Sequence, residues 1–197
     1  MVLQRVVVAL CVVLVVAGCS TPHIPSPPQH LPAASLPARI PLADGTGVPR
    51  ERAPRWELVA DRHPARVWRR GYAIRGIDGT SVTYSRTGCT LTLTERRVHL
   101  PFWTGDDLEP TTDVAGSGTP KAVAARPAAA PGTPTTLVEF VRTESRTSLG
   151  RAEARLTRVL GATSTMLGAS VRCSDRASLR RAERSLDGDL LVVFDAR

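Results

Sequence analysis

The 197-residue chain contains no asparagine, a single lysine (Lys121) and few aromatic residues, namely three Phe, three Trp and two Tyr. Two catalytic patterns are also missing. With only one lysine there is no Ser-x-x-Lys pair, and no G-x-S-x-G turn is present to expose a nucleophilic serine. The sequence therefore offers no recognisable catalytic residues, and we predict a protein that is not an enzyme.

Long hydrophobic runs are absent too. The longest, residues 6–16, follows a single positive charge at Arg5. It is well short of the roughly 20 apolar residues that a membrane-spanning helix requires. A charged start followed by a short apolar run is the layout of a secretory signal peptide. We therefore expect residues 1–18 to be removed on export.

The signal-like region ends in Val16-Ala17-Gly18-Cys19. This tetrapeptide resembles the lipobox of bacterial lipoproteins, in which an aliphatic residue and two small residues precede an invariant cysteine. Val16 stands where that family most often has leucine. The resemblance implies that Cys19 receives a diacylglyceryl group and that cleavage follows Gly18. It also implies a palmitate-type lipid anchor on the extracytoplasmic face of the cell membrane, because two acyl chains hold a protein there stably.

The formal net charge of +8 could indicate a polyanionic partner. Nucleic acid is a poor candidate, because the sequence has no recognition motif and the predicted compartment contains none. An anionic leaflet is a better one, since it attracts each nearby cation by about 1 kcal/mol. We therefore expect the membrane, and possible envelope partners, but no nucleic acid.

Four cysteines are present, of which Cys11 lies in the signal region and Cys19 in the lipobox. The other two, Cys89 and Cys173, fall on the apolar face of alternating, strand-like segments. In an exported domain such a pair is expected to form a disulfide. Two buried free thiols are the alternative. A metal site is not expected, because no second pair of soft ligands is near.

Proline marks the predicted domain boundaries. Residues 19–55 contain many prolines and few large apolar residues, which predicts a lipidated, disordered tether. Residues 56–197 are expected to form a single domain, interrupted by a flexible Pro/Ala-rich loop at about 111–134.

The alternation of apolar residues predicts an α+β domain built on an antiparallel sheet. Its first hairpin is expected to turn through three residues, 77–79, pairing Ile74 with Val82 and Tyr72 with Tyr84; a two-residue Asp-Gly loop gives a poorer register. Strands are also expected at 89–94 and 136–143, with an edge strand at 98–103. Residues 149–160 fit a helix or a strand equally well.

The C-terminal pattern is clearer. Ser174 or Asp175 is placed to cap a helix over about 175–187, with Gly188 closing it. Its inward positions would be Leu179, Ala182 and Leu186. A last, buried strand is expected over about 190–194.

Candidate site residues are sparse. His63 and His99 lie far apart without a third ligand, so no metal or other cofactor is expected. The acidic cluster Asp106, Asp107, Glu109 and Asp113 lacks the spacing of a calcium loop, and a solvated turn is its ordinary interpretation. Phe102 and Trp103 could contact a partner or ligand; the alternative is a role in the core.

These observations favour a membrane-anchored envelope lipoprotein with a non-enzymatic binding or scaffold domain at the cell surface. Its partner would be an envelope protein, a lipid or a wall polymer. Two alternatives stay open. One is a carrier of lipid or another hydrophobic ligand, which needs an internal apolar cavity. The other is a cell-wall-processing enzyme that uses the acidic cluster.

Overall fold

A computed structural model describes residues 36–59, 67–129, 132, 134–147 and 149–196 of the chain. The strands are β1 (Arg39–Ile40), β2 (Arg52–Leu58), β3 (Arg69–Gly76), β4 (Gly79–Arg86), β5 (Cys89–Arg97), β6 (Thr119–Pro127), β7 (Thr136–Arg146), β8 (Ala152–Leu160), β9 (Thr165–Cys173) and β10 (Leu190–Ala196). The helices are α1 (Leu108–Ala115), the short 3-10 helix η1 (Gly161–Thr163) and α2 (Arg176–Asp189).

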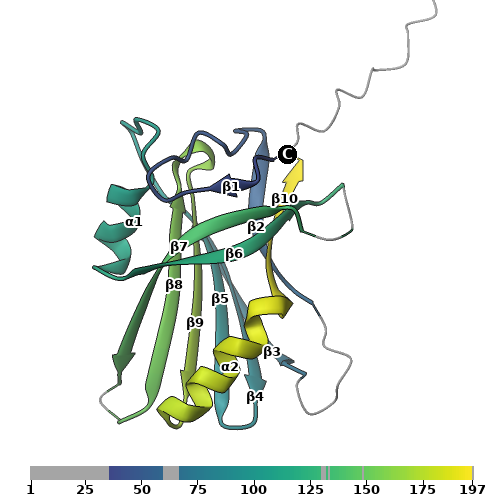
Figure 1. Ribbon diagram of the computed structural model, residues 1–197, viewed down its shortest axis with the longest axis vertical. Coiled ribbons are helices and arrows are strands. Elements are labelled where there is room, and N and C mark those ends of the chain that lie inside the picture. The colour runs from purple at the N-terminus through teal and green to yellow at the C-terminus, as the bar shows by residue number, and fades with distance from the viewer. Residues whose placement is uncertain (1–35, 60–66, 130–131, 133, 148, 197) are drawn as a thin grey trace, which may run out of the picture. The chain divides into compact units, whose positions relative to one another are not determined.

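The described strands form one mixed sheet in the order β2-β10-β6-β7-β8-β9-β5-β4-β3, with β1 added beside β7. Most neighbours are antiparallel, but β1 runs parallel to β7 and β10 parallel to β6. The domain is therefore predominantly β, and the expectation of an antiparallel α+β sheet was correct only in part. The parallel pair arises because α2 carries the chain back across the sheet before β10 begins (Figure 1).

The sheet curls around its core, which brings β2, at one end of the strand order, against β5 near the other end. The Trp56 backbone N–H donates to Glu95 Oε1 at 2.8 Å, from β2 to β5. The Trp56 ring also stacks on Phe140 of β7, with centroids 5.2 Å apart. Burial raises the pKa of Glu95, and the hydrogen bond from the Trp56 N–H opposes this shift by lowering it.

Helix α2 packs on the inner face of this sheet. Asp175 caps it by accepting a hydrogen bond from the Ser178 N–H, and the predicted inward residues are buried: Leu179, Ala182 and Leu186. The predicted C-terminal helix and last strand are thus confirmed. Gly188 does not close the helix, however, because the helix continues through Asp189 directly into β10.

Residues 36–55 belong to the folded body, so the tether predicted over 19–55 was too long. Strand β1 pairs with β7, and β2 begins within the predicted tether. The few large aliphatic side chains of this Pro-rich stretch are all buried: Leu36, Ile40, Leu42 and Val48. Widely spaced apolar residues do not form a core alone, but they can fill one that the sheet supplies. The rest of the predicted tether, 19–35, lies outside the described residues.

The flexible loop predicted at about 111–134 was also wrong over most of its length. Residue Thr111 lies within α1, and β6 follows from Thr119. Strand β6 is central, pairing with β7 on one side and β10 on the other. Its inward residues Val123 and Ala125 are buried. Pairing on both edges thus keeps this segment in a strand although its side chains are small.

The first hairpin turns through two residues, Ile77 and Asp78, rather than the predicted three. Gly76 pairs with Gly79 and Ala73 with Val82, and a bulge follows at Arg70–Ala73. A side chain at Gly79 would place its Cβ 1.9 Å from the Glu95 carbonyl oxygen, so close approach to β5 fixes glycine there. The predicted pairs Ile74–Val82 and Tyr72–Tyr84 therefore do not form.

Four other segments were also predicted from the sequence. Residues 149–160, left open between helix and strand, contain β8. The strands expected at 89–94 and 136–143 are confirmed as parts of β5 and β7. The edge strand expected at 98–103 is wrong, because the chain leaves the sheet after Arg97 as a loop toward α1.

Candidate functional site

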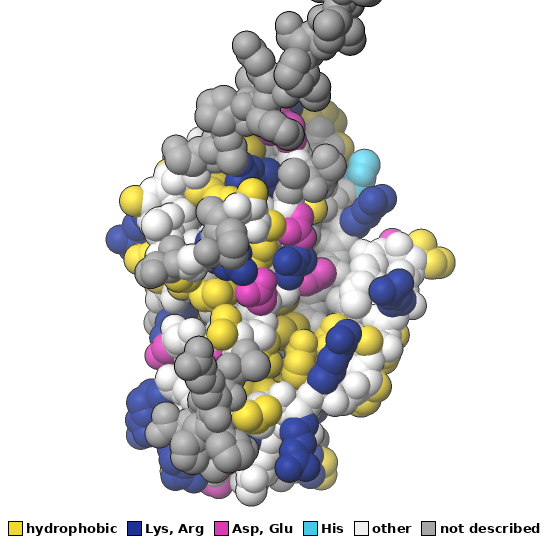
Figure 2. Space-filling view, turned by 90° about the vertical axis from the view of Figure 1, so that its right-hand side faces the viewer, with side chains coloured by type: hydrophobic (Ala, Val, Ile, Leu, Met, Phe, Trp, Pro, Cys, Tyr) yellow, Lys and Arg dark blue, Asp and Glu magenta, His cyan; other side chains and the backbone are white. Residues whose placement is uncertain are grey.

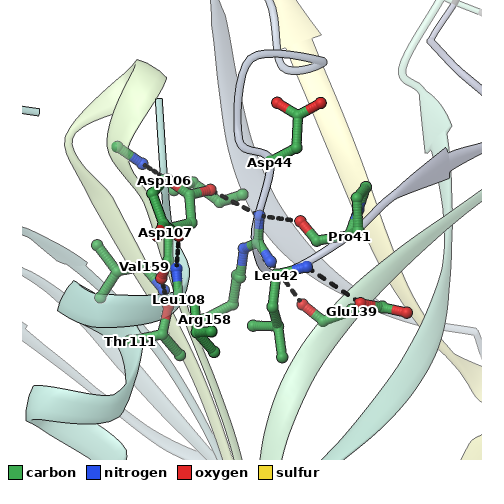
Figure 3. Close-up of polar contacts among 12 residues, drawn as sticks. Pro41, Leu42, Asp44, Asp106, Asp107, Leu108, Thr111, Glu139, Arg158 and Val159 are labelled. Carbon is green, nitrogen blue, oxygen red and sulfur yellow. Dashed lines mark hydrogen bonds and ion pairs between the residues drawn. The ribbon is translucent and has the colours of Figure 1, made fainter. Parts of the chain in front are cut away.

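The loop that leaves β5 is held by a buried ion pair between Asp107 and Arg158. Asp107 precedes α1, and Arg158 lies on β8. Arg158 Nη2 is 2.6 Å from Asp107 Oδ2, and neither side chain has any exposed surface. The guanidinium also donates to the carbonyl oxygens of Pro41 at 2.9 Å and Glu139 at 3.2 Å (Figure 3). The Arg158 guanidinium on β8 thus links the segment that contains Pro41, strand β7 and the loop that precedes α1.

The second carboxylate oxygen of Asp107 fixes two further elements. It accepts hydrogen bonds from the Trp103 indole N–H and the Gly161 backbone N–H, each at 2.9 Å. The Trp103 ring covers Gly161 so closely that a Cβ there would lie 2.0 Å from the indole nitrogen. The Trp103 side chain is therefore half-buried and held in one position by these contacts.

The electrostatics of the pair reflect its burial. Burial raises the pKa of Asp107, and the Arg158 charge opposes that shift, as do the hydrogen bonds from Gly161 and Trp103. Burial also lowers the pKa of Arg158, opposed chiefly by Asp107. Each charge is acceptable in the interior because the other is present and hydrogen-bonded.

Above this network lies a surface hollow of about 210 Å³. Phe102 lines it with 91% of its surface exposed, and Trp103 belongs to the same lining. Three members of the predicted acidic cluster also line it: Asp106, Glu109 and Asp113. We call this hollow the Phe102 pocket. Asp107, the fourth member, is turned inward, so the interpretation of all four as a solvated turn was wrong for that residue.

The Phe102 pocket combines an aromatic face with negative charge. Carboxylates beside an aromatic ring attract cations, through charge pairing and through the ring quadrupole. The Asp106 carboxylate also accepts a hydrogen bond from the Leu108 N–H at 2.7 Å, which holds it at the pocket edge. Chemically, the arrangement suits an ammonium or guanidinium group.

His99 is exposed and does not line the Phe102 pocket, and His63 lies outside the described residues. Within the part of the chain that the structure describes, no three His, Cys, Asp or Glu side chains are grouped so as to hold a metal ion.

The predicted disulfide is confirmed between Cys89, at the start of β5, and Cys173, at the end of β9. The two residues are direct cross-strand partners with Cα atoms 4.2 Å apart, and both are buried. Ser174 N–H donates to the Gly88 carbonyl oxygen beside the bridge. The bond therefore fixes the point from which α2 begins, on the opposite end of β5 from the Phe102 loop.

The sequence interpretation did not identify Arg158, although a signal for it exists. If 149–160 is a strand, then its even-numbered residues share one face. That face carries Ala152, Ala154, Leu156, Arg158 and Leu160. A single arginine in an otherwise apolar alternation predicts a buried cation, which in turn requires a buried acid.

Cys19, the predicted lipidation site, lies outside the described residues. Among the helices of the described ranges, none has the length and apolar character to cross a membrane. No protein-family model, curated protein or solved structure matches the chain.

Proposed function

We propose that this chain is a membrane-anchored envelope lipoprotein whose folded body is a non-enzymatic binding domain. The lipobox-like Val16-Ala17-Gly18-Cys19 supports the anchor. The Phe102 pocket supports the binding role, and it is the observation that carries the proposal. Phe102, 91% exposed, and three carboxylates line one hollow, so a cationic partner could pair with the carboxylates and cover the aromatic ring.

The proposed partner presents a cationic group, such as an arginine or lysine of an envelope protein or an amine of a wall polymer. The buried Asp107–Arg158 pair supports this by holding the loop and Trp103 in one arrangement. A pre-organised pocket loses less conformational entropy on binding than a mobile loop does.

A carrier function has weaker support. Its ligand would need an enclosed apolar space, and sites for small molecules typically measure about 300–1,000 Å³. The mostly apolar hollow between α2 and the sheet, lined by Val123, Leu156 and Leu186 among others, measures about 40 Å³. A lipid chain does not fit such a space, so we favour binding at the surface.

An enzyme of the cell wall has weaker support as well. Its chemistry would call for a partly buried carboxylate facing the ligand. Asp107 is the buried carboxylate of this region, but its oxygens are occupied by Arg158, Trp103 and Gly161. The carboxylates that do face the Phe102 pocket are exposed.

The binding role is tested by quantitative affinity capture from detergent-solubilised membranes. Three chains are compared: the unaltered chain, Phe102→Ala, and Leu149→Ala as a control, since Leu149 is 79% exposed elsewhere on the surface. We expect at least one envelope component that the unaltered and Leu149→Ala chains retain and that Phe102→Ala and high salt both release. If Phe102→Ala retains every component at the unaltered level, the Phe102 pocket is not the binding site.

A further inference from the structure

The β3–β4 hairpin is the most exposed part of the described sheet. Strand β3 ends the strand order, and all eight of its residues are exposed. Three large apolar side chains stand free on the hairpin: Tyr72 is 65% exposed, Ile74 58% and the tip residue Ile77 fully. Side chains of this size are seldom left in water together without a surface to cover them.

Arginines surround these apolar residues. Five exposed ones lie on β3 or at the adjoining end of β5: Arg69, Arg70, Arg75, Arg96 and Arg97. Among the described residues, none of these five is within ion-pair distance of a carboxylate. Figure 2 shows the face that includes this hairpin, where Lys and Arg side chains stand beside exposed hydrophobic ones.

The positive charge is concentrated at the hairpin tip. Arg75, Arg96 and Arg97 line one open hollow of about 470 Å³ together with Ile77. Two carboxylates belong to the same lining, Asp78 at the tip and Glu95. The Glu95 side chain points inward and accepts the Trp56 N–H, so the three arginines outweigh the acids at the surface.

We propose that this tip is a second membrane contact, in which the hairpin docks on an anionic phospholipid surface. Ile77 enters the headgroup region, and the guanidinium groups of Arg75, Arg96 and Arg97 bind lipid phosphates. Charge complementarity is the main argument, since arginine pairs well with phosphate. The inference deepens the proposed function, because the lipid on Cys19 would hold this hairpin near a bilayer.

The edge of β3 is less suited to pairing with a partner strand. A bulge between Arg70 and Ala73 interrupts its register, and arginines lie both before and after that bulge along the strand. Bulges and charged edge residues are the usual features that prevent strand addition. The tip therefore fits a lipid surface better than an extended peptide.

The test measures vesicle binding by an unlipidated chain that begins at Ser20, which retains the whole described core. Vesicles of phosphatidylcholine alone are compared with vesicles containing phosphatidylcholine and phosphatidylglycerol in equal amounts. We expect salt-sensitive binding only to the anionic vesicles. At about fivefold per cation, Arg75→Gln/Arg96→Gln/Arg97→Gln weakens the binding constant on the order of hundredfold.

The matched control is Arg180→Gln/Arg181→Gln/Arg184→Gln, which removes the same charge from exposed positions on α2. We expect it to change binding only slightly, and Ile77→Ser to weaken binding without altering its salt dependence. Equal losses in the two triple variants, or no binding to anionic vesicles, would overturn the proposal. Because the assay contains neither the anchor nor a change at Phe102, its failure would leave the proposed function standing.

Discussion

At the scale of single residues, the Asp107–Arg158 pair organises the region of the proposed site. Removing one partner of such a pair costs more stability than removing both. Replacing both charges of a buried pair with apolar groups can be neutral, but removing one strands the other in a medium of low polarity. Arg158 also supplies donors to two backbone carbonyls that lose their partner when it is removed.

We predict that Arg158→Met lowers the free energy of unfolding by about 3–5 kcal/mol, because Asp107 is left buried without a counter-charge. Urea titration of the purified domain measures this. Arg176→Met is the control, since its side chain is 58% exposed and its partner Glu144 is itself partly exposed. We expect that control to change stability by about 1 kcal/mol or less. Comparable losses in both variants would contradict a structural role for the buried pair.

At the scale of elements, the N-cap of α2 gives a prediction with a defined pH dependence. Hydrogen bonds from Ser178 lower the pKa of Asp175 to about 2, from an ordinary value of 3.8. A carboxylate with a lowered pKa stabilises the fold above its unfolded-state pKa, and loses that contribution as pH falls through its folded-state pKa. The stabilisation by Asp175 is therefore complete at neutral pH and disappears between about pH 4 and 2.

We predict that Asp175→Ala lowers the melting temperature at pH 7 because the first turn of α2 loses its acceptor. The difference from the unaltered chain should shrink as pH falls from 4 toward 2. Thermal unfolding followed by circular dichroism across this range measures it. A difference that stays constant down to pH 2 would show that Asp175 does not act through its charge.

The elements also show what the sequence could and could not predict. Helix α2 and strand β10 were predictable because their apolar residues recur at a clear period between a capping residue and the chain end. Strand β6 was missed because its alanines and prolines are typical of a loop, and only pairing on both edges makes it a strand. The hairpin register depended on the contact of Gly79 with β5, which no local pattern contains.

The site was predictable to a similar extent. Phe102 and the acidic residues were identified as candidates, but nothing in their spacing indicates that Asp107 faces inward while its neighbours line a pocket. That division depends on Arg158, which lies 51 residues further along the chain. Long-range pairing of this kind is decided by the fold and not by adjacent residues.

At the scale of the whole molecule, the Cys89–Cys173 bridge joins β5 to β9 across 84 positions of the sequence. The Phe102 loop and strands β6, β7 and β8 lie between these two strands in the sequence. A cross-link over a loop of this length restricts the unfolded chain strongly. It therefore stabilises the sheet as a unit rather than one hairpin.

We predict that Cys89→Ser/Cys173→Ser lowers the free energy of unfolding by about 4 kcal/mol in the chain-entropy account. Denaturant titration of the oxidised, reduced and double-variant proteins measures it, and the reduced and variant forms should agree. If all three unfold at the same denaturant concentration, then the bridge does not contribute to stability.

Both proposed contacts depend on where the molecule is held. Both proposed contacts, the Phe102 pocket and the β3–β4 tip, are interpreted for a domain tethered at the outer face of a membrane. That location derives from four residues, Val16 to Cys19, which precede the described structure. The location is therefore the claim to test before any partner is sought.

The most direct measurement is the intact mass of the protein extracted from membranes, beside a Cys19→Ala variant. We predict a mass that corresponds to residues 19–197 carrying a diacylglyceryl group on Cys19, and a variant that carries no lipid. A chain without lipid, cleaved at another position and released from the membrane, would contradict the membrane anchor and show a freely secreted protein.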